Sequence, residues 1–282
     1  MASHGQTVTA DLSAFRGRLV LVGAGKMGGA MLEGWLGLSL DPARVVVLEP
    51  QPSEQIIALR SRGLQLNPSD TSAGTTTALI IALKPQGASE VLLGLSRLVG
   101  PETLVVSIMA GHTLQFLGDA LPEGTAIVRA MPNTPAAIGR GITVAVANAG
   151  ASAEQRELAH RLLMATGAVE WVDDEALLDA VTAVSGSGPA YVFLLAESLA
   201  RAGVAAGLPA DLAARLARET VAGSGELLHR SKLDPATLRQ NVTSPAGTTA
   251  AALEVLMGPD GLDPLLEKAV GTATRRSREL AS

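Results

Sequence analysis

The stretch R-L-V-L-V-G-A-G-K-M-G-G-A-M-L, residues 18–32, decides the fold of this chain. It opens with a short apolar run, Leu19 to Val22, of the kind that forms a strand buried on both faces. Glycines follow in the spacing G-x-G-x-x-G: Gly23 permits a tight turn, Gly25 lets the backbone approach a pyrophosphate, and Gly28 lets the next helix pack against the strand. The N-terminal amides of that helix then point at the pyrophosphate. The pattern predicts a dinucleotide-binding turn; the alternative is a glycine-rich turn without a ligand.

The composition limits the class of protein. The 282 residues are 47% hydrophobic but only 2% aromatic, which favours cores built from aliphatic side chains. A formal net charge of −5 argues against nucleic acid as a partner. The chain has no cysteine and its 4 histidines never fall at metal-ligand spacing, so we expect neither disulfides nor a metal site. No apolar run reaches the length of about eighteen residues that a membrane segment needs, which predicts a soluble, cytoplasmic protein.

Apolar strands alternate with helices over the first part of the chain. This alternation is typical of a doubly wound parallel sheet, and we place such a Rossmann domain at residues 18–172. The predicted strands cover 44–48, 64–66, 78–82, 103–108 and 126–130, with additional edge strands at 142–147 and 169–172; the predicted helices cover 26–36, 53–62, 88–98, 112–121 and 153–165. Residues 1–17 are predicted to form a polar, mobile N-terminal extension.

Beyond residue 172 the sequence predicts only helices. Ala- and Leu-rich segments run over 175–184, 188–206, 210–230, 235–240, 247–257 and 259–280, so residues 173–282 are predicted to form a separate all-helical domain. Several of these helices are apolar on more than one face, and such a helix must be buried by a neighbour. A domain of roughly 110 residues has too little interior to bury all of them. We therefore expect helices of two subunits to pack together; the alternative is a compact monomeric bundle.

An acidic residue stands where NAD-binding domains hold the adenosine ribose. Glu49 follows the second predicted strand, 21 residues after Gly28. Its carboxylate would repel a 2′-phosphate, and no lysine or arginine lies between Glu49 and Arg60 to offset that repulsion. The sequence therefore favours NADH over NADPH. The alternative is a solvated acid at the strand end, turned away by Pro50 and Pro52.

Three further turns are expected at the same edge of the sheet, because each follows a strand at its carboxyl end, where ligands bind in open α/β folds. They are Lys84-Pro85, Ser107 to Gly111, and Ala130 to Pro135. In the last of them, prolines stiffen the loop and would present Asn133 and Thr134 at a fixed place. Together the turns predict contacts with cofactor or substrate, although each alone is compatible with ordinary turn chemistry.

Two strings in the helical half carry polar groups at helix starts. Ser185-Gly-Ser-Gly-Pro189 precedes one long helix and lacks the G-x-S-x-G pattern of serine hydrolases. Asn241-Val-Thr-Ser-Pro-Ala-Gly-Thr-Thr249 precedes another, where Gly247, Thr248 and Thr249 would offer free amides and hydroxyls at a positive helix end. This second string predicts a site for a small carboxylate. The alternative for both strings is helix capping alone.

With these strings the chain resembles the pyrroline-5-carboxylate reductase family. The resemblance extends over about residues 18–280 and rests on V-G-A-G-K-M-G-G-A-M-L (22–32), A-L-K-P (82–85), S-I-M-A-G (107–111), R-A-M-P-N-T-P (129–135), V-S-G-S-G-P-A-Y (184–191) and S-P-A-G-T-T (244–249). The last two strings separate this family from other dehydrogenases of the fold. The resemblance implies reduction of 1-pyrroline-5-carboxylate to L-proline with NADPH or NADH, the final step of proline biosynthesis. It also implies a homodimer with interleaved C-terminal helices, often assembled further into a decamer.

The motifs and the resemblance together assign residues to roles. The cofactor-binding residues are Gly23, Ala24, Gly25, Lys26, Met27 and Gly28 at the pyrophosphate, Glu49 at the ribose, Ala82, Leu83, Lys84 and Pro85 on the nicotinamide side, and Met131, Pro132 and Asn133 nearby. The substrate-binding residues are Asn241, Val242, Gly247, Thr248 and Thr249, on a loop that in this family faces the partner subunit. Two positions depart from the family. Glu49 stands where many members have a small polar or basic residue, and Gln240 stands where an acid often precedes Asn241.

The reaction implied by the resemblance needs little acid–base chemistry, because a protonated cyclic imine is already electrophilic and the enzyme mainly has to position it. Ser187 and Thr249 are the candidate catalytic hydroxyls for proton donation, and solvent is the alternative. Two other functions stay open. A related reductase of another imine or a hydroxy acid usually needs a helical-domain lysine, and Lys232 and Lys268 do not lie at glycine-rich helix starts. A dinucleotide-sensing module without turnover leaves the two helical-half strings unexplained.

Overall fold

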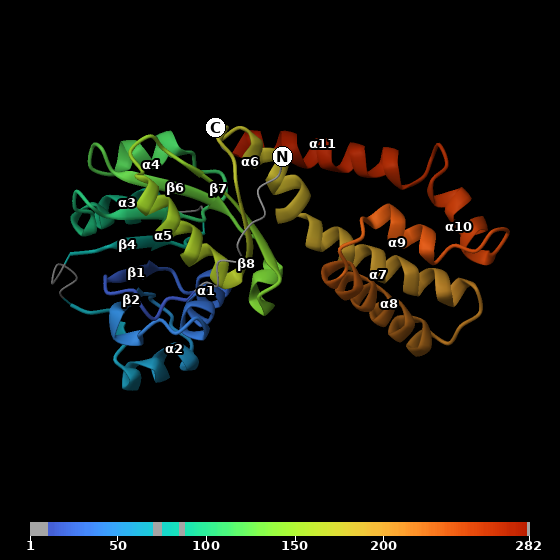
Figure 1. Cartoon of the computed structure of the whole chain (residues 1–282), viewed down its shortest axis with the longest axis horizontal. Helices are drawn as coiled ribbons and strands as arrows, with labels where there is room; N and C mark the ends of the chain where they lie inside the picture. Colours follow the sequence, from blue (N-terminus) through green and yellow to red (C-terminus); the bar gives the residue numbers. More distant parts are fainter. Residues whose placement is uncertain (1–10, 70–74, 85–87, 281–282) are drawn as a thin grey trace. The chain divides into compact units, whose positions relative to one another are not determined.

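The computed structural model describes residues 11–69, 75–84 and 88–280. Its internal contacts divide the chain into two compact units. Unit 1 comprises the residues up to Gly186 together with those from Arg275 onward, and unit 2 comprises Ser187–Thr274. The sheet of unit 1 and the helices of unit 2 are labelled in Figure 1. The chain therefore passes from one unit to the other twice.

Unit 1 is built on one eight-stranded sheet with the strand order β3-β2-β1-β4-β5-β6-β7-β8. The strands are β1 (Leu19–Val22), β2 (Val45–Leu48), β3 (Gln65–Leu66), β4 (Ala78–Ile81), β5 (Leu104–Ser107), β6 (Ala126–Met131), β7 (Gly141–Ala147) and β8 (Gly167–Trp171). All neighbouring strands are parallel except β6 and β7. The predicted strands are thus confirmed, and the order β3-β2-β1-β4-β5-β6 is that of a Rossmann domain.

Helices cover both faces of this sheet, and alternate residues of each central strand face opposite layers (Figure 1). Leu19 and Leu21 of β1 pack in one buried cluster with α1 (Lys26–Gly37) and α5 (Ala153–Leu163). Val20 and Val22 pack in the other cluster with α3 (Ala88–Leu95) and α4 (Leu114–Ala120). A short helix, α2 (Glu54–Ala58), follows β2. Burial of each aliphatic side chain contributes about 1.5–3 kcal/mol, so the two layers hold the predicted doubly wound fold together.

The strand β7 runs opposite to its neighbour, which the sequence did not indicate. Its register with β6 pairs Val128 with Ala147 and Met131 with Val144. Parallel pairing needs a crossover of a dozen or more residues, and the connection from Pro132 to Arg140 is too short for one. β7 therefore folds back beside β6, and it lies between β6 and β8. The prediction that 142–147 forms an edge strand is wrong, while the prediction for 169–172 is confirmed by β8 at the edge.

The described part of the predicted N-terminal extension belongs to the core. Leu12 is 1% exposed and Phe15 is 8% exposed, and both lie in the cluster that contains α1. The amide of Leu12 also donates a hydrogen bond of 2.8 Å to the carbonyl of Leu38. Two large apolar side chains are enough to dock this segment. The prediction of a mobile extension is therefore wrong for residues 11–17, and residues 1–10 lie outside the described residues.

Unit 1 also contains the short helix α6 (Leu177–Val181), beyond the boundary predicted at residue 173. Leu178 is 1% exposed and packs with Val144 and Val146 of β7. Residues from the end of the chain return to this helix, because the Ser277 hydroxyl donates a 2.7 Å hydrogen bond to Asp179. The contacts of residues 173–186 are therefore those of unit 1, and the domain limits remain a prediction.

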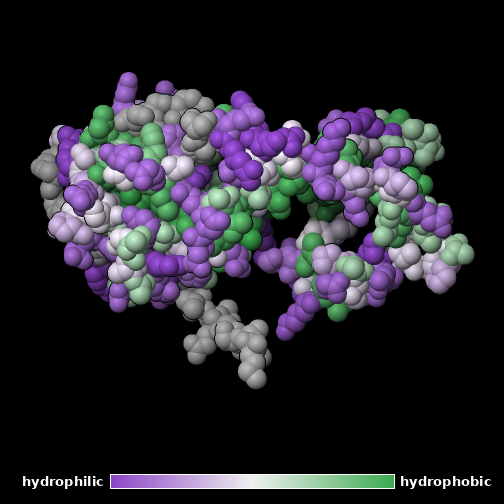
Figure 2. Space-filling model, turned by 90° about the horizontal axis from the view of Figure 1, so that it is seen from above, coloured by the Kyte–Doolittle hydropathy of each residue, from purple (hydrophilic) through white to green (hydrophobic). Residues whose placement is uncertain are grey.

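Unit 2 consists of helices, as predicted for this part of the chain. These are α7 (Gly188–Ala205), α8 (Ala210–Arg230), α9 (Pro235–Asn241), α10 (Thr248–Leu256) and α11 (Leu262–Leu280), of which α11 continues into unit 1. Ala213 and Ala217 of α8 are its only buried apolar residues among those described, at 2% and 3% exposure. Large apolar side chains instead reach the surface, including Phe193 at 69% and Val255 at 75% exposure. Figure 2 shows apolar residues of the surface in green.

Candidate active site

Two glycines of the G-x-G-x-x-G segment, one in the turn after β1 and one in α1, have no room for a side chain. Gly23 has a left-handed backbone, with φ +85°, and a Cβ there would lie 2.6 Å from the carbonyl oxygen of Ala82. A Cβ at Gly28 would lie 2.1 Å from the carbonyl oxygen of Gly23, so α1 can approach β1 this closely only without it. At Gly25, by contrast, a Cβ would meet no heavy atom of the described residues within 4 Å. The backbone of Gly25 therefore faces open space at the N terminus of α1.

The carboxylate of Glu49 points at this turn. Its Oε2 accepts a hydrogen bond of 2.8 Å from the amide of Ala24, and its Oε1 accepts one of 2.9 Å from the amide of Gln51. The alternative of a Glu49 turned away from the glycines is thus wrong. A carboxylate has about four lone-pair sites, so each oxygen keeps one for a further donor such as a ribose hydroxyl.

A pocket of about 420 Å³ opens beside the glycine turn. Of the residues predicted to bind the cofactor, it is lined by Ala24, Gly25 and Lys26. The opposite wall comes from the segment after β2, which includes Gln51, Ser53, Gln55, Ile56 and Leu59. No local sequence pattern marks this wall. A concave site with a few polar groups on an apolar wall, at the carboxyl edge of a parallel sheet, is typical of nucleotide binding.

The strands β1, β4 and β5 end in register at this edge, and β6 continues beyond them to Met131. Val22 pairs with Ile81, Ile81 with Ser107, and Ser107 with Arg129. The predicted turns after β4, β5 and β6 therefore emerge side by side, next to the glycine turn. Of these, Ala82 and Leu83 are half-buried and Lys84 is exposed, whereas Pro85 lies outside the described residues.

The turn after β6 is fixed by its own hydrogen bonds. The Asn133 carbonyl oxygen Oδ1 accepts a 2.9 Å hydrogen bond from the amide of Ile142, the second residue of β7. Pro132 is buried, and Met131 is half-buried at the end of β6. Asn133 thus stabilises the reversal into β7, and its side-chain amino group is left as the part that could reach a ligand.

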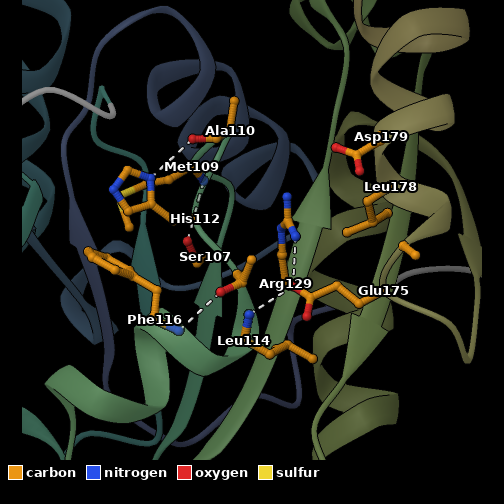
Figure 3. A network of polar contacts seen from close by, with 12 residues as sticks. Ser107, Met109, Ala110, His112, Leu114, Phe116, Arg129, Glu175, Leu178 and Asp179 are labelled. Atoms are coloured by element: carbon orange, nitrogen blue, oxygen red, sulfur yellow. Dashed lines mark hydrogen bonds and ion pairs between the residues drawn. The ribbon is translucent and has the colours of Figure 1, made fainter. Parts of the chain in front are cut away.

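A partly buried ion pair shapes the loop after β5 (Figure 3). The Arg129 guanidinium lies 2.6 Å from Oε1 of Glu175, and the side chains are 9% and 27% exposed. The same oxygen accepts a hydrogen bond of 2.8 Å from the amide of Leu114 at the start of α4. Within the loop, the Ser107 hydroxyl accepts the amide of Met109 at 3.3 Å. One carboxylate thus joins β6, the start of α4 and the segment leading to α6.

In unit 2, the two predicted strings lie at helix N termini. Ser187 precedes α7, and its hydroxyl makes no capping hydrogen bond there. Asn241 ends α9, and Val242, which follows it, is 65% exposed. The N terminus of α9 is capped by Asp234, whose pKa is lowered by hydrogen bonds from the Thr237 hydroxyl and then from the Thr237 amide.

The loop between α9 and α10 is held in an unusual backbone conformation. Ala246 has φ +56°, a left-handed value that costs a non-glycine residue about 1–2 kcal/mol. The next residue, Gly247, is the N-cap of α10, and its amide donates to the carbonyl of Ser244 at 3.0 Å. The prediction of a free Gly247 amide is therefore wrong. Thr248 and Thr249 occupy the first turn of α10, where amides have no acceptor within the helix.

Comparison with known proteins identifies the family. Residues 175–280 match the family model described as pyrroline-5-carboxylate reductase dimerisation, and residues 18–111 match the model described as NADP oxidoreductase coenzyme F420-dependent. The chain is 38% identical over 265 residues to the pyrroline-5-carboxylate reductase of Pseudomonas aeruginosa, covering 94% of this chain and 97% of that protein. The chain belongs to the pyrroline-5-carboxylate reductase family. It is an oxidoreductase, and the resemblance seen in its motifs is confirmed.

Solved structures of other family members have the same fold as this reductase. A pyrroline-5-carboxylate reductase from Coxiella burnetii is 31% identical with a TM-score of 0.86, covering 94% of this chain and 99% of that one. The Plasmodium falciparum pyrroline carboxylate reductase, solved with NADP bound, is 27% identical with a TM-score of 0.78, covering 95% and 99%. The Rossmann sheet followed by a helical dimerisation domain is therefore the fold of the family.

Sequence reasoning missed some side chains at the site of this reductase. Arg129 and Glu175 are 46 residues apart in sequence, and no local pattern pairs them. Asn67 holds the backbone of Glu49 through two hydrogen bonds, of 2.9 and 2.7 Å. A signal for Asn67 was present, because the dipeptide Asn67-Pro68 directly after a strand marks a special turn.

Proposed function

We propose that this enzyme takes its hydride from NADH, bound at the carboxyl edge of the unit 1 sheet, and holds its substrate by the carboxylate at the N terminus of α10. The reaction is that of its family: it reduces 1-pyrroline-5-carboxylate to L-proline. The observation that carries the cofactor assignment is the direction of the Glu49 carboxylate, which accepts the Ala24 amide of the glycine turn at 2.8 Å. As the final step of proline biosynthesis, the reaction would take place in the cytoplasm.

The electrostatics of the pocket support NADH over NADPH. A ribose with free hydroxyls can donate to Glu49, whereas a 2′-phosphate would place two negative groups within a few ångströms of each other. The wall from Gln51 to Leu59 contains no lysine or arginine that could offset this repulsion. Lys26 is the one cation among the described residues that line the pocket, but it also lies in the first turn of α1, where the pyrophosphate would need it.

Replacing Glu49 with serine is expected to reverse the cofactor preference. Serine removes the negative charge but keeps a small hydroxyl, so the KM for NADH should rise and the KM for NADPH should fall, each by about tenfold, or about 1.4 kcal/mol. The measurement is the ratio of kcat/KM for the two cofactors. Glu170→Ser on β8, an exposed acid elsewhere in unit 1, is the control and should leave the ratio unchanged. An unaltered ratio in Glu49→Ser would rule out Glu49 as the selecting residue.

The first turn of α10 suits the substrate carboxylate. The amides of Thr248 and Thr249 lie at the positive end of a nine-residue helix, and their hydroxyls add donors. Anchoring the carboxylate would stop the ring from turning while the nicotinamide faces the imine carbon. By analogy with its family, the loop would hold the substrate beside the cofactor that the partner subunit binds. Thr249 and Ser187 remain the candidate proton donors, with solvent as the alternative.

Thr249→Val is expected to raise the KM for 1-pyrroline-5-carboxylate about 10- to 100-fold. The substitution keeps the shape but removes a hydroxyl that donates to a charged group, which contributes about 1.5–3 kcal/mol. The KM for NADH should stay within twofold of the wild-type value and serves as the internal control. A loss of kcat in addition to the rise in KM would favour Thr249 as proton donor. Unchanged substrate kinetics would remove Thr249 from the site.

Self-association supports the proposed substrate site at the N terminus of α10. The dimerisation family model covers all of unit 2, and the apolar side chains exposed on its helices need a covering surface. We expect that surface to be a second copy of the chain, with a decamer as a further assembly. The segment Leu177–Ala205 would also satisfy a membrane span by length and hydropathy, with 11% of it buried. Helices covered by a partner subunit meet the same test, so a soluble homodimer without nucleic acid or membrane partners stays our expectation.

A further inference from the structure

Asn67 connects the sheet to Glu49 in a way that local sequence does not require. Strands β3 and β2 pair through Val46 with Gln65 and Val47 with Leu66. Asn67 comes next, and its amide continues the ladder with a 2.9 Å hydrogen bond to the carbonyl of Val47. Beyond this point the backbone of β3 leaves the sheet, because Asn67 has φ +44°.

The side chain of Asn67 then makes hydrogen bonds that the backbone of β3 would make if the strand continued. Its Oδ1 accepts the amide of Glu49 at 2.9 Å, and its Nδ2 donates to the carbonyl of Glu49 at 2.7 Å. In a regular parallel ladder the carbonyl of residue 67 and the amide of residue 69 would make these two bonds, and here one side chain makes both. Asparagine is suited to the position, because it tolerates the left-handed region and carries both a donor and an acceptor.

Glu49 is therefore fixed both at its backbone and at its carboxylate. Asn67 holds its amide and carbonyl, while the amides of Ala24 and Gln51 hold Oε2 and Oε1. Because all four contacts are in place, the remaining lone pairs of the carboxylate point in fixed directions beside the pocket. Loss of the backbone contacts would let Glu49 move relative to the glycine turn, and hydrogen bonds to a ribose depend steeply on such geometry.

We propose that Asn67 is a positioning residue for cofactor selection, which acts by holding Glu49 in place for the ribose hydroxyls. The inference rests on the proposed role of Glu49 and assigns a second residue to it. Asn67 is not among the residues that line the pocket, and both hydrogen bonds described for its side chain are to the backbone of Glu49. It follows that selectivity for NADH depends on a side chain contributed by β3 as well as on the acid after β2.

Asn67→Gly is the decisive variant, because glycine adopts the left-handed backbone freely and only the side-chain hydrogen bonds are lost. We expect the NADH-to-NADPH ratio of kcat/KM to fall three- to tenfold, through a higher KM for NADH at an unchanged kcat. Ser39→Gly is the matched control, since Ser39 is another non-glycine residue of unit 1 with a left-handed backbone, at φ +67°. It should leave both cofactor constants unchanged. If Asn67→Gly were to lose its cooperative thermal transition, Asn67→Asp, which keeps the acceptor for the Glu49 amide, would replace it.

A double-mutant cycle with Glu49→Ser separates this inference from the proposed function. In the Glu49→Ser background, Asn67→Gly should no longer change the cofactor ratio, because there is no carboxylate left to position. Equal effects of Asn67→Gly in both backgrounds would show a merely structural role and overturn the inference. If Glu49→Ser changes the ratio and Asn67→Gly alone does not, the inference fails while the proposed function stands. If Glu49→Ser itself has no effect, both fail.

Discussion

Alanine at Gly28 is expected to weaken NADH binding about 100-fold and to lower the melting temperature of the enzyme. The added Cβ would lie 2.1 Å from the carbonyl oxygen of Gly23 and 3.1 Å from the Cβ of Ala82, so α1 must move away from β1. Overpacking of this kind costs about 1–3 kcal/mol of folding stability. The displaced helix also withdraws its N-terminal amides from the pyrophosphate, and two lost charge-assisted hydrogen bonds correspond to about 3 kcal/mol of binding. Isothermal titration and thermal unfolding measure the two effects.

Substitutions at two other glycines distinguish an effect on cofactor binding from an effect on folding. Gly25→Ala introduces a Cβ into open space, so the melting temperature should hold while NADH affinity falls as far as in Gly28→Ala. Gly37→Ala at the end of α1, where a Cβ likewise meets no described atom within 4 Å, should affect neither property and is the control. Wild-type affinity in Gly25→Ala would show that the cofactor does not approach this turn.

An aspartate at Leu195 is expected to break the dimer and with it the activity. Leu195 is 51% exposed on α7, and Val192 and Leu199 lie on the same face of the helix, at 46% and 43%. If a second subunit covers this face, the variant buries an unpaired carboxylate, which costs about 3–5 kcal/mol. The dissociation constant of the dimer should then rise about 100- to 4000-fold. Sedimentation velocity combined with activity at matched protein concentration measures both changes.

The control for this variant is Leu93→Asp on α3 in unit 1. Leu93 is 70% exposed, so the same chemical change there should leave assembly and activity intact. A Leu195→Asp enzyme that stays dimeric would place the α7 face outside the subunit contact. A monomer with full activity would instead show that each chain completes its own active site.

Much of the fold was predictable because single residues carry strong constraints. Short apolar runs bounded by turn residues, such as Ala78–Ile81, favour buried strands, and the glycines at 23 and 28 leave room only for a tight turn and a close helix. The exposed apolar surface of unit 2 was also predictable, because the composition of its helices leaves several of them without a polar face. These features are local, so the sequence alone determines them.

Other features depend on residues that meet only after folding. The direction of β7 follows from the length of a connection, which strand periodicity does not encode. The burial of Leu12 and the pairing of Arg129 with Glu175 join segments that are far apart in sequence. The Glu49 carboxylate could have pointed to solvent or to the glycines, and its hydrogen bond to Ala24 became apparent only in three dimensions.

The return of α11 to unit 1 has a consequence for biosynthesis. Ser277 and Arg278 contact Asp179 at 2.7 and 3.6 Å, yet they leave the ribosome only after all of Ser187–Thr274 has been made. At a translation rate of about 5–20 residues per second, this delay is on the order of ten seconds. During that time α6 of the nascent chain lacks this partner, and a premature stop before residue 275 would leave α6 without it permanently.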